Sequence, residues 1–248
     1  MVNAGIPGAR LEQSLINLKQ RVLPLSPDVV VVYHANNDMA RDTQVLAASE
    51  GLDVAKRRSP GPIEFLSKYS MLVDLAYKNL AISNQSNTEK LSSVPQDIAN
   101  GFGDQLREFV ETAHNADAQV VLSHFITKYR SDQSLDEQTK NADVAFYYMP
   151  WMKAEHFAST INSYNQEISD VAASTEAPIV KDVDSIPADS QHFKDCMHFA
   201  DAGCEKMAMR FADFLSSSGM IDKIEQGQPS AFTSISPSSA ERIVSSQP

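Results

Sequence analysis

Long apolar runs and clusters of basic residues are both missing from this chain of 248 residues. No apolar stretch approaches the roughly 18–20 residues that a membrane-spanning helix needs, so we expect no transmembrane segment. No segment has the pattern of a secretory signal peptide. The formal net charge is −11, which argues against a nucleic-acid partner because phosphates repel an acidic surface. The densest basic cluster, Lys56-Arg57-Arg58, is typical of a solvated loop.

Cysteine is also scarce, because the chain has only Cys196 and Cys204, eight positions apart. Three interpretations stay open for this pair: two free thiols, a disulfide that closes a short loop, or two metal ligands. A disulfide would favour a periplasmic or secreted location over the cytoplasm. The sequence otherwise leaves the localisation open.

Helical and extended patterns alternate along the chain, and 42% of the residues are hydrophobic, enough for the core of one domain. Apolar residues at helical spacing predict helices over residues 11–22, 66–80, 106–113, 157–171 and 204–215. Apolar runs predict strands over residues 28–34, 118–126 and 178–183. This alternation predicts an α/β fold with a parallel sheet covered by helices.

Three polar segments interrupt or follow this pattern. Residues 35–62 are expected to be irregular, and residues 128–143 are expected to form a charged insertion. From Glu225 onward the chain is rich in serine and proline, so this tail is expected to be disordered.

Asp195 and His198 stand three positions apart in a loop that precedes the last predicted helix. A neutral imidazole is a good proton acceptor near pH 7. A carboxylate bonded to its other ring nitrogen fixes the tautomer and stabilises the imidazolium once it forms. The spacing therefore indicates a general base and its orienting acid, although two loop residues that cap the helix would show the same pattern.

A second polar motif, Asn36-Asn37-Asp38, follows the valine-rich strand. Ligands of open parallel sheets bind at the carboxyl ends of the strands. An asparagine at that point can direct its side-chain amide at a developing oxyanion, and Asn37 is the candidate. A simple polar turn is the alternative interpretation, since Asn and Asp favour turns.

The third motif is Asn3-Ala4-Gly5-Ile6-Pro7-Gly8, which leads into the first predicted helix. Glycine lets the backbone approach a substrate closely, and its N–H can donate to an oxyanion. Taken alone, the motif also fits a tight turn between a strand and a helix.

Together the three segments resemble three of the four sequence blocks of the SGNH, or GDSL-like, hydrolase superfamily, in the family's order. The resemblance covers residues 2–216 and implies a flavodoxin-like three-layer α/β sandwich around a parallel sheet. It implies one domain over residues 1–218, with insertions near 40–95 and 128–150, followed by the tail 225–248.

The resemblance implies hydrolysis of carboxylic ester bonds by a serine esterase or a lipase-like enzyme. His198 would act as the base, Asp195 would orient it, and Gly8 and Asn37 would form the oxyanion hole. No cofactor or metal is implied, and the expected partner is a small-molecule or glycan acyl ester. Transfer of the acyl group to a sugar hydroxyl, as in a carbohydrate O-acyltransferase, is the nearest variant. The candidate substrate-pocket residues are His34, Asn36, Asp38, Ser123 and His124.

The family's Gly-Asp-Ser block, which carries the nucleophilic serine at the end of the first strand, has no counterpart in this sequence. In the family it lies upstream of the segment that begins here at Val2, and only Met1 precedes that residue. We therefore expect the chain as given to lack its first strand and its nucleophile, and to be nearly inactive. The sequence also departs from the family at Ala35, where a glycine is usual.

Three alternatives stay open. The chain could be a non-catalytic domain that binds a small molecule or a glycan. Ser123, beside His124 at the end of a predicted strand, could replace the absent nucleophile. His192, Asp195 and His198 could instead bind a metal, with both cysteines nearby, as in a metal-dependent hydrolase. The oligomeric state is not indicated by the sequence.

Overall fold

The computed structural model describes residues 1–54, 70, 72–73 and 89–226. The predicted helix over 66–80, the Lys56-Arg57-Arg58 cluster and nearly all of the tail predicted from Glu225 fall outside the described residues.

Three parallel strands form the sheet in the order β1-β2-β3, as predicted for an α/β fold. They are β1 (Val29–Val32), β2 (Gln119–Ser123) and β3 (Ile179–Val180). The strand predicted over 178–183 is thus only two residues long, and the one predicted over 118–126 ends at Ser123.

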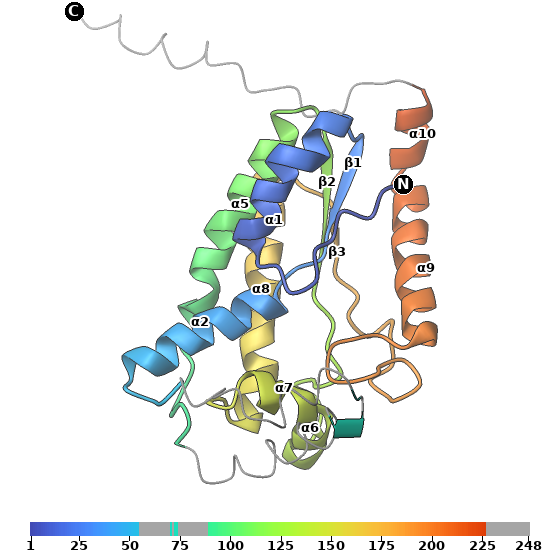
Figure 1. Cartoon of the computed structure of the whole chain (residues 1–248). Coiled ribbons are helices and arrows are strands. Elements are labelled where there is room, and N and C mark those ends of the chain that lie inside the picture. The colour runs from blue at the N-terminus through green and yellow to red at the C-terminus, as the bar shows by residue number, and fades with distance from the viewer. Residues whose placement is uncertain (55–69, 71, 74–88, 227–248) are drawn as a thin grey trace, which may run out of the picture.

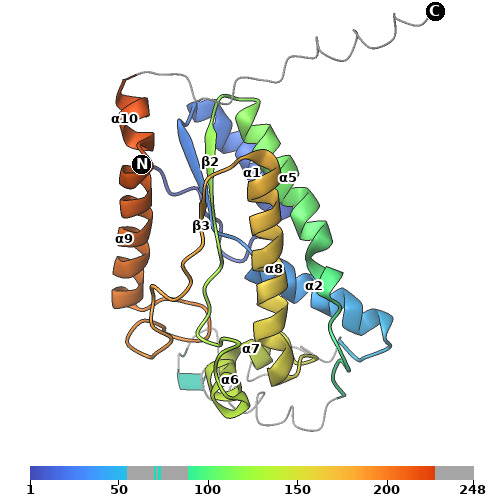
Figure 2. The same cartoon turned by 180° about the vertical axis from the view of Figure 1, so that it is seen from behind.

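Helices cover both faces of the sheet and make a three-layer arrangement (Figures 1 and 2). One face carries α1 (Leu11–Asn17), α5 (Asn100–His114) and α8 (Ala154–Thr175). The other carries α9 (Asp201–Ser217) and α10 (Met220–Glu225). No helix among the described residues is both long and apolar enough to cross a membrane.

The side chains of β2 alternate between the two layers, as the pleat requires. Val120 and Leu122 belong to the core cluster that includes residues of α1, α5 and α8. Val121 belongs to a second cluster, with Val180 and Met220, on the side of α9 and α10. Val120, Val121 and Leu122 are all completely buried, because helices cover both faces of this central strand.

Residues 35–62 were expected to be irregular, and this prediction was wrong for their first part. Helix α2 (Asn36–Ser49) begins directly after β1. Its buried stripe is narrow and consists of Met39, Thr43 and Ala47, spaced four apart. Polar residues dominate the rest of the helix, so the apolar period is weak in the sequence.

The insertion predicted near 128–150 contains two short helices. Helix α6 (Leu135–Asn141) begins at Ser134, whose hydroxyl accepts the Glu137 N–H while the Glu137 carboxylate accepts the Ser134 N–H. This reciprocal cap stabilises the first turn of a helix that buries none of its own residues. Helix α7 (Asp143–Tyr148) follows, and the short helices η1 (Leu18–Val22), η2 (Leu23–Leu25) and η5 (Gln96–Ala99) complete the fold.

Strand β1 lies at an edge of the described sheet, because it pairs with β2 alone. Its Val31 side chain is 42% exposed, whereas Val121 beside it in the register is fully buried. Strands of parallel sheets are normally covered on both faces, so the exposure of Val31 is unusual for such a strand.

We expect the replacement Leu122→Ala to destabilise the fold by about 2–5 kcal/mol, because it opens a cavity in the central strand. Leu25→Ala is the matched control, since Leu25 is largely exposed and should cost less than about 0.5 kcal/mol. Equilibrium unfolding in urea measures both values. Equal losses in the two variants would contradict this description of the core.

Candidate active site

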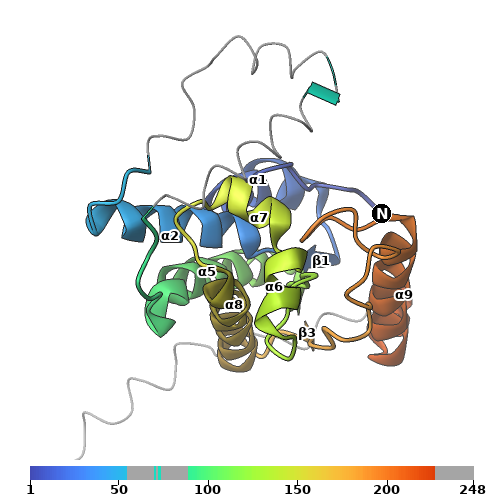
Figure 3. The same cartoon turned by 90° about the horizontal axis from the view of Figure 1, so that it is seen from below.

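The three sequence motifs meet at the carboxyl end of the sheet, which Figure 3 views from below. The Asn37 side-chain amide donates to the carbonyl of Ala9, next to Gly8, at 2.9 Å. The neighbouring Asn36 amide lies 2.9 Å from the Met197 sulfur, within the segment between Asp195 and His198. Two adjacent asparagines, Asn36 and Asn37, thus connect the segment after β1 to the Gly8 turn and to the Asp195–His198 loop.

Asp195 and His198 form a hydrogen-bonded pair. The Asp195 Oδ2 lies 2.7 Å from the His198 Nδ1, and its Oδ1 accepts the N–H groups of Met197 and His198 at 2.9 and 2.8 Å. This pairing leaves the His198 Nε2 as the nitrogen that can accept a proton. The His198 side chain is 66% exposed, so a reacting group can reach the ring.

The surroundings of Asp195 keep its carboxylate ionised. Partial burial by itself would raise its pKa, but the N–H groups of Met197 and His198, together with the imidazole, lower it below the ordinary value. An ionised Asp195 is what the pair needs to stabilise an imidazolium at His198.

Gly8 lies in the turn that leads into α1, beside the amide of Asn37. Its φ of 75° falls in the left-handed region, which residues other than glycine rarely adopt. One hydrogen of the Asn37 amide is used by the Ala9 carbonyl, and the second remains for another acceptor. The Asn37 amide is therefore attached to the residue that follows Gly8.

Sequence reasoning missed a second polar chain beside this point, formed by Ser14, His34 and Asp38. The Ser14 Oγ lies 2.8 Å from the His34 Nε2, and the His34 Nδ1 lies 3.3 Å from the Asp38 Oδ2. The other Asp38 oxygen accepts the N–H of Leu11, the first residue of α1, at 2.9 Å. Asp38 is buried, and together with His34 it joins α1 to the end of β1.

Comparison with known protein families decides the affiliation. The model of the family "GDSL-like Lipase/Acylhydrolase" matches residues 1–211. The chain belongs to this family. No curated protein matches the sequence.

Solved structures of GDSL-like proteins share the fold. A GDSL-like lipase from Bacteroides thetaiotaomicron matches with a TM-score of 0.50 and 15% identity, over 86% of this chain and 74% of the lipase. A protein from Bacteroides fragilis, described as an acylhydrolase, matches with the same TM-score and identity, over 86% of this chain and 73% of its own. An acetyl xylan esterase matches with a TM-score of 0.48 and 15% identity, over 85% of this chain and 78% of the esterase.

Ser123 and His124 lie at the end of β2 and bond to groups outside the GDSL-family motifs. Ser123 is 1% exposed, and its hydroxyl accepts a hydrogen bond from Arg210 at 3.1 Å and donates to the His124 carbonyl. The His124 Nε2 pairs with the Ser169 hydroxyl at 2.8 Å, and burial, helped by the charges of Lys181 and Arg210, lowers the pKa of His124. This burial argues against Ser123 as a substitute nucleophile.

The two histidines that were considered as metal ligands each use Nδ1 for a different aspartate. His192 pairs with Asp189 at 2.7 Å, and His198 pairs with Asp195. Within the described ranges, no three His, Cys, Asp or Glu side chains are grouped so that they could hold a metal ion. Cys196 and Cys204 are free thiols, the first buried and the second exposed, so the disulfide that would favour a secreted location is not formed.

A cavity of about 220 Å³ lies at the loops that follow β2 and β3. Its lining residues include Phe125, Asp132 and Asn162. The Lys128 N–H donates to the Cys196 carbonyl at 2.9 Å, so the cavity wall is attached to the loop that carries Asp195 and His198.

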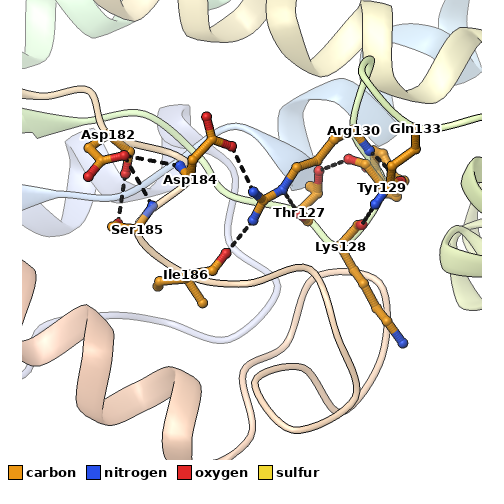
Figure 4. Close-up of polar contacts among 9 residues, drawn as sticks. All are labelled: Thr127, Lys128, Tyr129, Arg130, Gln133, Asp182, Asp184, Ser185 and Ile186. Carbon is orange, nitrogen blue, oxygen red and sulfur yellow. Dashed lines mark hydrogen bonds and ion pairs between the residues drawn. The ribbon is translucent and has the colours of Figure 1, made fainter.

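Arg130 holds the two loops of this cavity together (Figure 4). Its Nη1 lies 2.8 Å from the Asp184 carboxylate, its Nη2 donates to the Ile186 carbonyl, and its Nε donates to the Thr127 carbonyl at 3.4 Å. The guanidinium charge is thus already matched by Asp184, which argues against a second anion as the occupant of the cavity.

The lowered pKa of Asp195 predicts a pH dependence of stability. A group whose pKa is depressed by folding contributes stability above its unfolded pKa, and this contribution is lost as the pH falls through the folded value. We therefore expect Asp195→Asn to be less stable than the parent from pH 5 to 8. Below the ordinary aspartate pKa of about 3.9 the difference should shrink. Urea unfolding across this pH range measures it, and a difference independent of pH would contradict an ionised Asp195.

Proposed function

We propose that this chain carries the base, the orienting acid and the oxyanion hole of an SGNH-type carboxylic ester hydrolase. One observation supports the proposal above the others. The loop of the Asp195–His198 pair contacts Asn36 through Met197, and the next residue, Asn37, bonds to Ala9 beside Gly8. A base without an adjacent oxyanion site, or the reverse, would not support acyl transfer.

In the proposed reaction a serine hydroxyl attacks the acyl carbonyl of the ester. The His198 Nε2 takes the hydroxyl proton, and Asp195 stabilises the imidazolium that forms. The Gly8 N–H and the Asn37 amide donate to the negatively charged oxygen of the tetrahedral intermediate. His198 then protonates the leaving alcohol, and water releases the acyl group by the same steps.

The serine itself is the one component that these 248 residues do not supply in the family's motif, since Gly-Asp-Ser does not occur in the sequence. We infer that the chain as given is catalytically incomplete. A Gly-Asp-Ser segment encoded in frame about 30–50 residues before Val2, the length of one strand–helix unit, would supply the serine.

Two features support a small-molecule or glycan acyl ester as the substrate class. They are the exposed imidazole of His198 and the cavity at the loops that follow β2 and β3. Acyl transfer to a sugar hydroxyl uses the same groups, with the sugar replacing water. A non-catalytic binding domain is the alternative, and the absence of any upstream Gly-Asp-Ser segment in the gene would favour it.

The chain of 248 residues should not turn over p-nitrophenyl acetate above the rate of its own His198→Ala variant. The nucleophile, base and acid act as a unit, so losing the serine costs about as much rate as losing all three, on the order of 10⁶ in subtilisin. Initial rates of p-nitrophenol release measure this. Turnover by the parent that His198→Ala abolishes would show that a serine within the chain serves His198.

In the protein extended by its natural upstream sequence, His198→Ala should abolish turnover of p-nitrophenyl acetate. Asn37→Ala should lower kcat by about 10²–10³, the usual cost of one oxyanion donor. His114→Ala is the matched control, because this histidine ends α5 at the opposite end of the sheet, and its effect should stay within about twofold. Unchanged turnover in His198→Ala would overturn the assignment.

A further inference from the structure

The segment from Asp189 to Asp201 contains the same pattern twice. The residues Asp189, His192, Phe193 and Asp195 are spaced as Asp195, His198, Phe199 and Asp201 are, so Asp-x-x-His-Phe-x-Asp recurs after six positions. Asp195 closes the first copy and opens the second.

Both copies form the same turn. In the first, the Asp189 Oδ1 accepts the N–H groups of Gln191 and His192 at 3.0 Å each and lies 2.7 Å from the His192 Nδ1. In the second, Asp195 makes the corresponding bonds to Met197 and His198 at 2.9, 2.8 and 2.7 Å. The sequence repeat is therefore also a repeat of hydrogen bonds.

The two turns are paired with each other through their histidines. The His198 carbonyl accepts the Lys194 N–H at 2.8 Å, and the His192 carbonyl accepts the Ala200 N–H at 2.9 Å. Between these bonds Phe193 and Phe199 form an antiparallel bridge, with ring centroids 5.0 Å apart. Each turn thus holds the backbone of the histidine in the other.

The two histidines differ in exposure. The His192 side chain is 8% exposed, whereas the His198 side chain is 66% exposed. The His192 carbonyl also lies against the first turn of α9, where a Cβ on Gly203 would approach it to 2.1 Å. The first turn is accordingly anchored in the fold, and the second presents its imidazole to solvent.

We propose that Asp189 and His192 are positioning residues for His198, and that the first turn, whose histidine is buried, holds the second turn in place. The alignment of an exposed imidazole with its carboxylate has to overcome the rotational freedom of the side chain. The cross-turn bonds to Lys194 and Ala200 supply that restraint from outside the Asp195–His198 pair. The catalytic meaning of this inference rests on the proposed function, but the alignment of His198 can be measured without any substrate.

The test is the tautomer of His198 in the chain of 248 residues, read from imidazole ¹⁵N chemical shifts. The spectra are recorded at about pH 8.5, well above the ordinary histidine pKa of about 6.5. In the parent, the bond to Asp195 should hold the proton on Nδ1. Asp189→Ala should shift the population of His198 toward the Nε2–H form. Asp189→Asn keeps the Oδ1 acceptor and should leave the tautomer as in the parent. Asp195→Ala removes the carboxylate that bonds to His198, so it gives the tautomer population without that bond.

Asp182→Ala is the matched control. The Asp182 Oδ1 accepts the N–H groups of Asp184 and Ser185 at 3.1 Å each, which is the same kind of turn in a neighbouring loop (Figure 4). It should leave the His198 tautomer unchanged.

An unchanged tautomer in Asp189→Ala would overturn the proposal, as would an equal shift in Asp182→Ala or in Asp189→Asn. If Asp189→Ala does not fold, His192→Gln decides instead, because it removes only the imidazole from the first turn. The His198 tautomer should then shift in the same direction, and no shift would overturn the proposal. None of these results depends on esterase activity, so failure of the proposed function would be recognised separately.

Discussion

The buried carboxylate of Asp38 is the constraint on which the geometry of the candidate site depends. One of its oxygens holds the first N–H of α1, and the other faces His34 at the end of β1. A buried carboxylate is costly unless its oxygens are bonded, so the two elements cannot separate without leaving a charge unpaired. This fixes the start of α1 against the strand end. Gly8 precedes that start and Asn37 stands next to Asp38, so the two proposed oxyanion donors share one anchor.

The sequence predicted most of the elements because their apolar periods are strong. Helices α5, α8 and α9 and strands β1 and β2 were found in this way, and the parallel order followed from their alternation. Helix α2 was missed because only Met39, Thr43 and Ala47 of its residues make a regular buried stripe. Strand β3 was overestimated because only Ile179 and Val180 pair with β2, and residues 181–183 do not continue the ladder.

The candidate site was predicted to a similar extent and for similar reasons. Asp195 and His198 were recognised because both partners lie within four consecutive residues. The contact between Ser14 and His34 joins a helix to a strand end twenty positions away. No local sequence pattern predicts such a contact. The sequence analysis grouped His192 with Asp195 as possible metal ligands. The structure instead pairs His192 with Asp189, in the first copy of the repeat. The solved relatives share only 15% identity with this chain, so the shared fold does not reveal which of its side chains pair with each other.

The open edge of β1 has a consequence for how a reacting group could reach this site. Neighbouring strands lie about 4.8 Å apart, and parallel strands end at the same side of a sheet. Any strand that joined β1 in parallel along its free backbone would end beside Tyr33, His34 and the two asparagines that follow. Its last residue would need no long loop to face His198. The position of an attacking group would then be set by the spacing of backbone hydrogen bonds, which is far stiffer than a loop, and Val31 would become part of the interior.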